Sequence, residues 1–269
     1  MPQPQLRANA ISQVLTELKR MEERRGHTTQ LDERRLQKSL ASLDDSAESL
    51  VSSKAIQAQW NRDYEAFDSA VAAMLELDDL SRPHSLYVNF ALMSIHALNP
   101  LLSSRLNHAA FRAEQRQPKF LRHVLRNAWH VADLELYEEV ISQLGRLNAD
   151  DYEELYEPLQ ASRDLLDHHG VTPAELQQHI QRVFELIRGF LTNRVDAYLG
   201  FGLEPETYDD GHQELVLEFE LGVDDDTLDA IDEALLSLLS DPSRVRPELN
   251  KCVGVLVRDY PESVSAEAC

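Results

Sequence analysis

Residues 214–223 read ELVLEFELGV, and at this stretch the character of the chain changes. Its apolar residues recur at every second position: Leu215, Leu217, Phe219 and Leu221. A period of two is typical of a half-buried β-strand, whereas the chain before about residue 200 shows the three- and four-residue spacing of amphipathic helices. The sequence therefore predicts a mainly α fold, a bundle or array of about seven or eight helices, followed by a small C-terminal α+β module.

The residues after this strand complete the module. Asp226 or a neighbour is expected to cap a helix across Thr227–Ser240, which Asp241-Pro242 ends. Cys252 to Val257 alternates again and predicts a second strand. The module is thus predicted to be strand–helix–strand, with a third strand around Tyr198–Phe201.

In the helical part that precedes the module, Gly and Pro residues mark the expected ends of the helices. The expected helices cover 6–25, 29–51, 55–80, 85–98, 101–116, 119–145, 150–169 and 172–199, with a break at Ser81-Arg82-Pro83. The strongest start is Thr172-Pro173-Ala174-Glu175, where Thr172 caps, Pro173 opens the helix and Glu175 completes a capping box. Serial helices are typical of a tetratricopeptide-like stack, but no convincing repeat of 30–45 residues is found.

These patterns suggest three regions. Residues 1–52 form a helical hairpin or arm, which is expected to be partly exposed and is a candidate for homo-oligomer contacts. Residues 53–199 form a helical core domain. Residues 200–269 form the acidic α+β module.

Composition bounds the function classes. The chain has 269 residues and a formal net charge of −21, so nucleic acid and anionic membranes repel it unless a basic patch intervenes. No signal peptide or membrane span is expected. With only Cys252 and the terminal Cys269, a structural disulfide is not expected, and a reduced cytoplasmic setting fits best.

The charge is segregated along the chain. Val195 to Ser243 holds fifteen acidic residues and no Lys or Arg, while the rest carries all 26 basic residues. Nine of these acids are expected to form a face across the strand and helix of the module: Glu214, Glu218, Glu220, Asp224, Asp225, Asp226, Asp229, Asp232 and Glu233. Such a face is either a solvated surface or a binding surface for a basic partner, and mimicry of DNA is a special case of the second.

A basic stretch lies in the middle of the chain. Residues 101–130 contain six cations against one acid, Glu114: Arg105, Arg112, Arg116, Lys119, Arg122 and Arg126. This stretch either contacts phosphate, as in a nucleic-acid-associated protein, or pairs with the acidic segment of the same chain or of a neighbouring subunit. The overall charge favours the pairing, so direct nucleic-acid binding is the weaker alternative.

Signals of catalysis are sparse. Asp167-His168-His169 matches the short signature of a metal-dependent phosphoesterase, but it ends a helix before Gly170 instead of following an apolar strand, so the favourable helix dipole explains the histidines. Glu175 and His179 are four positions apart and could share a metal ion, but no second such pair occurs to complete a metal site. Cys252 lies in an apolar pattern that suits a buried, inert thiol. No phosphate-binding Gly-rich loop or serine-nucleophile motif occurs.

The function expected from the sequence is therefore a bacterial-type, cytoplasmic, non-enzymatic protein-interaction factor: an inhibitor, immunity factor, adaptor or regulatory subunit. Its acidic C-terminal face would dock on a basic partner surface. The alternatives are a DNA-mimic inhibitor of a nucleic-acid-binding protein, a nucleic-acid-associated protein using the basic stretch, and a metal-dependent hydrolase using the Asp167-His168-His169 cluster. No catalytic residue, metal or cofactor is assigned.

Overall fold

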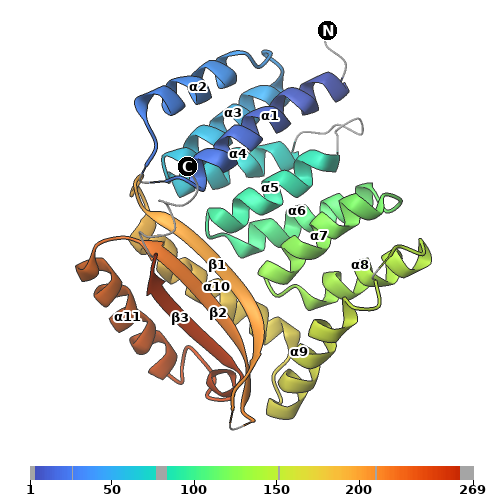
Figure 1. The fold of residues 1–269 in the computed structure, drawn as a ribbon, viewed down its shortest axis with the longest axis vertical. Coiled ribbons are helices and arrows are strands. Elements are labelled where there is room, and N and C mark those ends of the chain that lie inside the picture. Colours follow the sequence, from blue (N-terminus) through green and yellow to red (C-terminus); the bar gives the residue numbers. More distant parts are fainter. Residues whose placement is uncertain (1–3, 26, 77–83, 151, 210, 261–269) are drawn as a thin grey trace.

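A layered array of helices leads into a small sheet at the C-terminal end of the chain (Figure 1). The structure, a computed structural model, describes residues 4–25, 27–76, 84–150, 152–209 and 211–260. The predicted class, mainly α with a small C-terminal α+β module, is confirmed. The expected break at residues 81–83 and the terminal Cys269 lie outside the described residues.

Ten α-helices precede the sheet within the described ranges. They are α1 (Pro4–Glu22), α2 (Gln30–Ala41), α3 (Ala47–Trp60), α4 (Tyr64–Glu76), α5 (His84–His96), α6 (Pro100–Ala113), α7 (Pro118–His130), α8 (Leu134–Arg146), α9 (Tyr156–His169) and α10 (Pro173–Leu191). The C-terminal elements are β1 (Tyr198–Thr207), β2 (Gln213–Gly222), α11 (Asp225–Ser240), the short 3₁₀ helix η1 (Leu249–Lys251) and β3 (Val253–Asp259).

The same turn closes three helix hairpins: α3–α4, α5–α6 and α7–α8. Each turn has a residue in the left-handed conformation, namely Arg62 (φ 51°), Leu98 (φ 56°) and Ala132 (φ 51°). The next residue in each case is an Asp or Asn whose side chain accepts a hydrogen bond from the first turn of the following helix: Asp63, Asn99 and Asp133. These caps are 36 and 34 residues apart, so the backbone repeats although no sequence repeat was recognised.

Two predictions of a continuous helix are wrong because each predicted helix spans one of these hairpin turns. The predicted helix 55–80 is divided between α3 and α4 at Arg62, and the predicted helix 119–145 is divided between α7 and α8 at Ala132. In both, apolar residues continue at helical spacing across the turn. Neither turn contains the Gly or Pro that normally marks a helix end, so the apolar pattern alone could not place the break.

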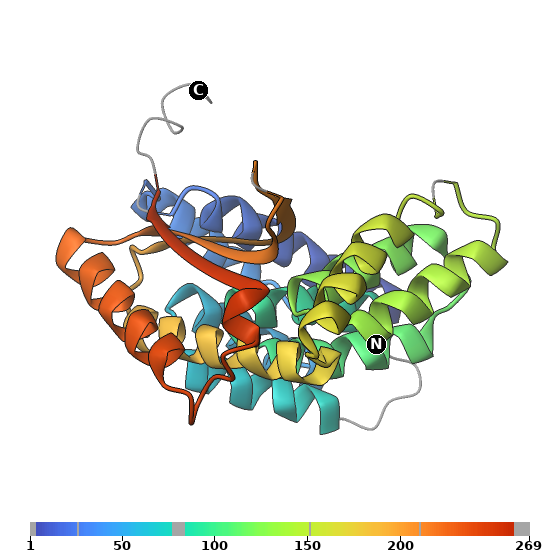
Figure 2. The same ribbon diagram turned by 90° about the horizontal axis from the view of Figure 1, so that it is seen from below.

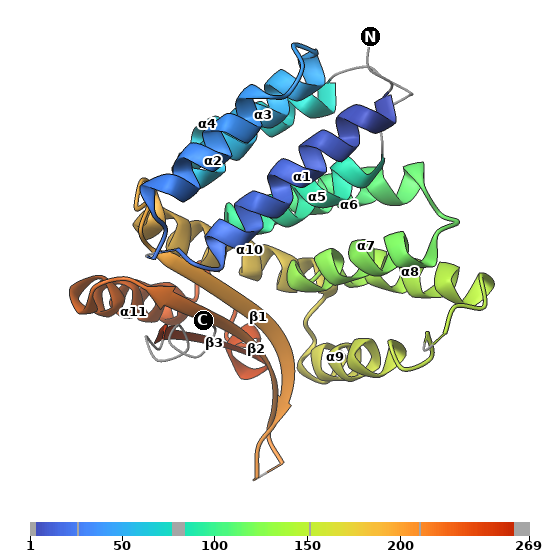
Figure 3. The same ribbon diagram turned by 45° about the horizontal axis from the view of Figure 1, so that its top comes forward.

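The N-terminal helix α1 packs against the helices that follow it. The apolar stripe of α1, formed by Ile11, Val14, Leu18 and Met21, is buried at 0–3% exposure. α1 contacts α3 and α5, and Figure 3 shows it lying alongside α5. Leu31 and Leu50 are exposed large apolar side chains among the described residues of this region, and self-association through the N-terminal helices stays a prediction.

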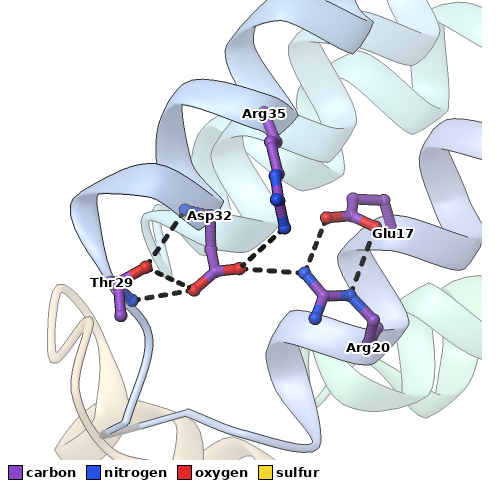
Figure 4. A network of polar contacts seen from close by, with 5 residues as sticks. All are labelled: Glu17, Arg20, Thr29, Asp32 and Arg35. Atoms are coloured by element: carbon purple, nitrogen blue, oxygen red, sulfur yellow. Dashed lines mark hydrogen bonds and ion pairs between the residues drawn. The ribbon is translucent and has the colours of Figure 1, made fainter.

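A polar network fixes the connection between α1 and α2 (Figure 4). Asp32 and Thr29 form a capping box at the start of α2, and Arg20 of α1 donates a hydrogen bond to Asp32 Oδ1 over 2.9 Å. The hydrogen bonds from Thr29, followed by the bond from Arg20, hold the pKa of Asp32 well below its usual range.

The sheet has the order β1-β2-β3, antiparallel between β1 and β2 and parallel between β2 and β3. Strand–helix–strand and the additional strand near Tyr198 are therefore confirmed, with Asp224 as the cap of α11. Leu217, Phe219 and Leu221 point from one face into the core, where Phe219 packs against Phe184 of α10. α10 and α11 contact each other beneath this face, as Figure 2 shows.

Candidate functional site

The glutamates of β2 lie on the face of the sheet that α10 and α11 do not cover. Glu218 and Glu220 alternate with the buried apolar row, and both pair with Arg258 of β3 over 2.7 Å. Glu214 accepts a hydrogen bond from the Tyr208 hydroxyl, which raises the pKa of Tyr208 to about 12. These three carboxylates already have partners within the module.

Asp224 supports the start of α11. Its Oδ1 accepts hydrogen bonds from the Thr227 hydroxyl and amide, and Oδ2 accepts from Arg194 over 2.9 Å. The Thr227 hydroxyl first, and then Arg194, lowers the pKa of Asp224 to about 2. Asp224 is thus an N-cap, and the local fold accounts for its charge.

The other five predicted residues form the surface that we call the α11 acidic surface: Asp225, Asp226, Asp229, Asp232 and Glu233. All five are exposed. No ion pair joins any of them to the described part of the chain. One turn further on, Leu236 is 68% exposed, in line with Asp229, Asp232 and Glu233 on the helix.

The nine predicted acids therefore do not form one continuous face. Strand side chains alternate between the two faces of the sheet, so the glutamates point away from the helices. α11 packs its Ile231, Leu235 and Leu238 side inward with α10, and its acidic side faces solvent on the opposite side of this two-layer module. The sheet and the body of α11 separate the two sets.

The basic stretch is divided between α6, the loop after it and α7. Arg105, Arg112, Arg116, Lys119 and Arg126 are exposed, and Arg122 is half-buried and donates a hydrogen bond to Asp150 O. Among the described residues, none of the six forms an ion pair with the acidic segment 195–243. The described residues therefore show no pairing of the basic stretch with the acidic segment of the same chain, and pairing with a neighbouring subunit stays a prediction.

The Asp167-His168-His169 segment ends α9, and Gly170 adopts the left-handed conformation (φ 62°) that closes the helix. The rings of His168 and His169 pack edge to face at 4.9 Å. His212, from the turn between β1 and β2, lines the same cavity of about 400 Å³ as His168 and His169. Within the described ranges, however, no three His, Cys, Asp or Glu residues are arranged to hold a metal ion.

Three further candidates have local structural roles. Glu175 forms the predicted capping box with Thr172 and also pairs with Arg246, while His179 is fully buried, so the two do not share a site. Cys252 is buried, as predicted, and burial raises the pKa of its thiol to about 11. At neutral pH it is a protonated, unreactive thiol.

Sequence reasoning missed a cavity of about 460 Å³ between α1, α5 and β1. Gln59, His96, His130 and Phe201 line it, and these residues are scattered over more than half of the chain. Only the folded backbone relates two of these residues to each other. His96 and His130 both lie two residues before the left-handed residue of their hairpin, as Trp60 does in the first hairpin.

Comparison of the chain with protein-family models, with curated proteins and with solved structures found no match. A search of the described helices for a segment long and apolar enough to cross a bilayer also found none.

Proposed function

We propose that this protein is a non-enzymatic, cytoplasmic protein-interaction factor that docks on a basic partner through the α11 acidic surface. One observation carries the proposal. Glu218 and Glu220 pair with Arg258 and Asp224 pairs with Arg194, whereas the five carboxylates of the α11 acidic surface have no arginine or lysine partner among the described residues.

Three of these five charges do not stabilise the helix that carries them. Asp225 and Asp226 lie in the first turn, where the helix dipole favours acids. Asp229, Asp232 and Glu233 lie beyond it, at spacings of three and four, where like charges repel and destabilise the helix by a few tenths of a kcal/mol per pair. A basic partner would relieve this repulsion, and Leu236 offers an apolar contact within the same surface.

The occupant we propose is a different protein, not a second copy. Each copy carries a net charge of −21, so two copies repel each other at long range. A basic protein is instead attracted, and its encounter with this chain is accelerated at low salt. A nucleic-acid-binding protein is one such partner, and duplex DNA would then compete for it.

Capture from a lysate of the native cell tests this proposal with two matched variants. The first carries Asp225→Asn, Asp229→Asn, Asp232→Asn and Glu233→Gln. The control carries Glu65→Gln, Glu135→Gln, Glu139→Gln and Glu157→Gln, which neutralise four exposed acids on α4, α8 and α9. Both variants remove four negative charges, so the net charge of each is −17.

The expected result is a basic protein that the wild type and the control variant retain and the α11 variant loses. Retention of the same proteins by all three immobilised chains would mean that the α11 acidic surface only keeps the protein in solution, and would overturn the proposal. Self-association that added salt abolishes would identify a second copy as the occupant instead and would also overturn it.

A further inference from the structure

The cavity between α1, α5 and β1 has the size and lining of a small-molecule site. Its volume of about 460 Å³ falls in the range of ligand pockets in proteins. Leu15 and Leu18 of α1, Leu92 and Met93 of α5, and Phe201 of β1 provide apolar walls. The cavity lies in a different part of the molecule from the α11 acidic surface and does not depend on the function proposed for that surface.

A residue with a buried, unpaired amide oxygen lines this cavity. Gln59, near the end of α3, is 2% exposed, and its Oε1 accepts no hydrogen bond from any described residue. A buried acceptor left unpaired is costly, and native proteins contain few of them. A ligand group that donates a hydrogen bond would satisfy Gln59 Oε1.

Two imidazoles flank the aromatic wall. The rings of His96 and His130 each meet the edge or face of Phe201 at a centroid distance of 5.4 Å. His130 Nδ1 is also buried without a hydrogen-bond partner. Burial lowers the pKa of both histidines, that of His130 to about 4, so both rings are neutral at pH 7.

The charged residues at the rim are paired with one another. Lys19 and Glu23 form an ion pair over 3.6 Å, and Glu22 pairs with the buried guanidinium of Arg25. Among the described lining residues there is thus no unpaired charge that would hold an ion. A charged ligand would lose its hydration without gaining a counter-charge, whereas a neutral ligand would not.

We propose that this cavity binds a neutral small molecule with an apolar, aromatic body and at least one hydrogen-bond donor. That donor forms a hydrogen bond to Gln59 Oε1. The aromatic body packs against Phe201, and the donor satisfies the amide oxygen that the protein leaves unpaired. The ligand is expected to be neutral because the charged residues at the rim are paired and the histidines that line the cavity are uncharged.

Fluorescence titration with two dyes tests the ligand class. N-phenyl-1-naphthylamine is neutral and apolar and has one N–H donor; 8-anilino-1-naphthalenesulfonate has the same aromatic body and an added negative charge. The full-length protein is expected to bind the neutral dye saturably at one site, and the sulfonate at least about tenfold more weakly.

Three variants locate the site. Thr16→Trp places a bulky side chain on the exposed part of α1 that lines the cavity. Gln59→Leu removes the unpaired amide oxygen, and Gln57→Leu makes the same change at an exposed position of the same helix. We expect Thr16→Trp and Gln59→Leu each to weaken binding of the neutral dye about tenfold, and Gln57→Leu to leave it unchanged.

A thermal-unfolding measurement without dye separates lost binding from lost folding. Because Gln59→Leu removes an unsatisfied buried group, its Tm is expected to equal or exceed that of the wild type. Absence of saturable binding by the wild type overturns the proposal, as does binding that is equally tight for the sulfonate. Binding unaffected by Gln59→Leu also overturns it, because the donor requirement rests on that amide.

Discussion

At the scale of single residues, His179 is a buried titratable group. It lies fully buried in α10, and neither ring nitrogen has a hydrogen-bond partner among the described residues. Burial first, and Arg182 second, lowers its pKa to about 4. The folded state therefore holds this imidazole neutral, although an unfolded chain protonates it below about pH 6.5.

His179→Leu is expected to stabilise the protein, and more strongly in acid. Between about pH 4 and pH 6.5 the unfolded wild type binds a proton at this residue that the folded wild type excludes, so its stability falls as the pH drops through that window. The variant lacks this loss. We expect a gain of about 1 kcal/mol at pH 8 from removing the unpaired nitrogens, and a further gain of about 2 kcal/mol at pH 5.

Urea unfolding at the two pH values measures the gain. His27→Gln, at an exposed histidine, is the control and is expected to leave the pH dependence of the wild type unchanged. A gain from His179→Leu that is the same at pH 5 and pH 8 would show that the folded protein protonates His179 as easily as the unfolded chain does.

At the scale of elements, the repeated hairpin turn uses the same kind of cap in different surroundings. Asp63 is exposed and accepts a hydrogen bond from the Ala66 amide. Asp133 is buried and accepts from the Leu136 amide, the Ser104 hydroxyl and His108. Burial alone would raise the pKa of Asp133, but the hydrogen bonds, led by that from His108, lower it overall.

Asp133→Ala is therefore expected to destabilise the protein more than Asp63→Ala does. The exposed cap is worth about 1 kcal/mol, and the buried one about 2–3 kcal/mol because its removal also leaves Ser104 and His108 without their acceptor. The hydrogen bond to Asp133 raises the pKa of His108, so this contribution is present below about pH 6.5 and is lost as the pH rises through the folded pKa.

Denaturant unfolding of the two variants at pH 6 and pH 9 checks this expectation. The loss in unfolding free energy should be greater for Asp133→Ala than for Asp63→Ala at pH 6, and this difference should become smaller at pH 9. Equal losses at pH 6 would mean that the bonds from Ser104 and His108 add nothing to the cap.

Elements with a local sequence signal could be predicted, whereas the breaks at the hairpin turns could not. The helix that begins with Thr172-Pro173 was predictable because its start combines a cap, a Pro at the first position and a capping box. The strand at 214–223 was predictable from its alternation. Arg62 and Ala132 gave no comparable indication, because a non-Gly residue in the left-handed conformation depends on the packing of the hairpin around it.

At the scale of the whole molecule, hydrogen bonds to backbone oxygens hold β1 and the segment just before it against the helical part. Arg25 and Arg62 donate to Val195 O and Ala197 O, and Trp129 Nε1 donates to Leu203 O over 2.7 Å. Each donor lies at or near the end of a helix in the stack. The module is therefore integrated with the helices, although its composition differs sharply from theirs.

We expect the module and the helical part to unfold together. Calorimetry should show one transition, and tryptophan fluorescence and far-UV circular dichroism should report the same midpoint. Trp129 is informative because its indole hydrogen bond depends on β1 remaining in place. Two resolved transitions, with the fluorescence change confined to one, would show that the module unfolds independently.

The candidate surfaces were less predictable than the fold. The sequence indicates which residues are acidic, but whether nine of them share a surface depends on how a strand and a helix pack in two layers. The cavity was not predictable at all by local pattern. Gln59, His130 and Phe201 come from α3, α7 and β1, and only the assembled stack brings them to one place.

The most direct test of the central claim is the rate at which the captured partner associates with the wild type and with the two matched charge variants as salt is raised. We predict that the wild type and the control variant associate fast at low salt and slow at least about tenfold between about 20 mM and about 500 mM salt. The α11 variant should start slower and change less. The same rate for all three chains, independent of salt, would contradict a function for the α11 acidic surface in binding.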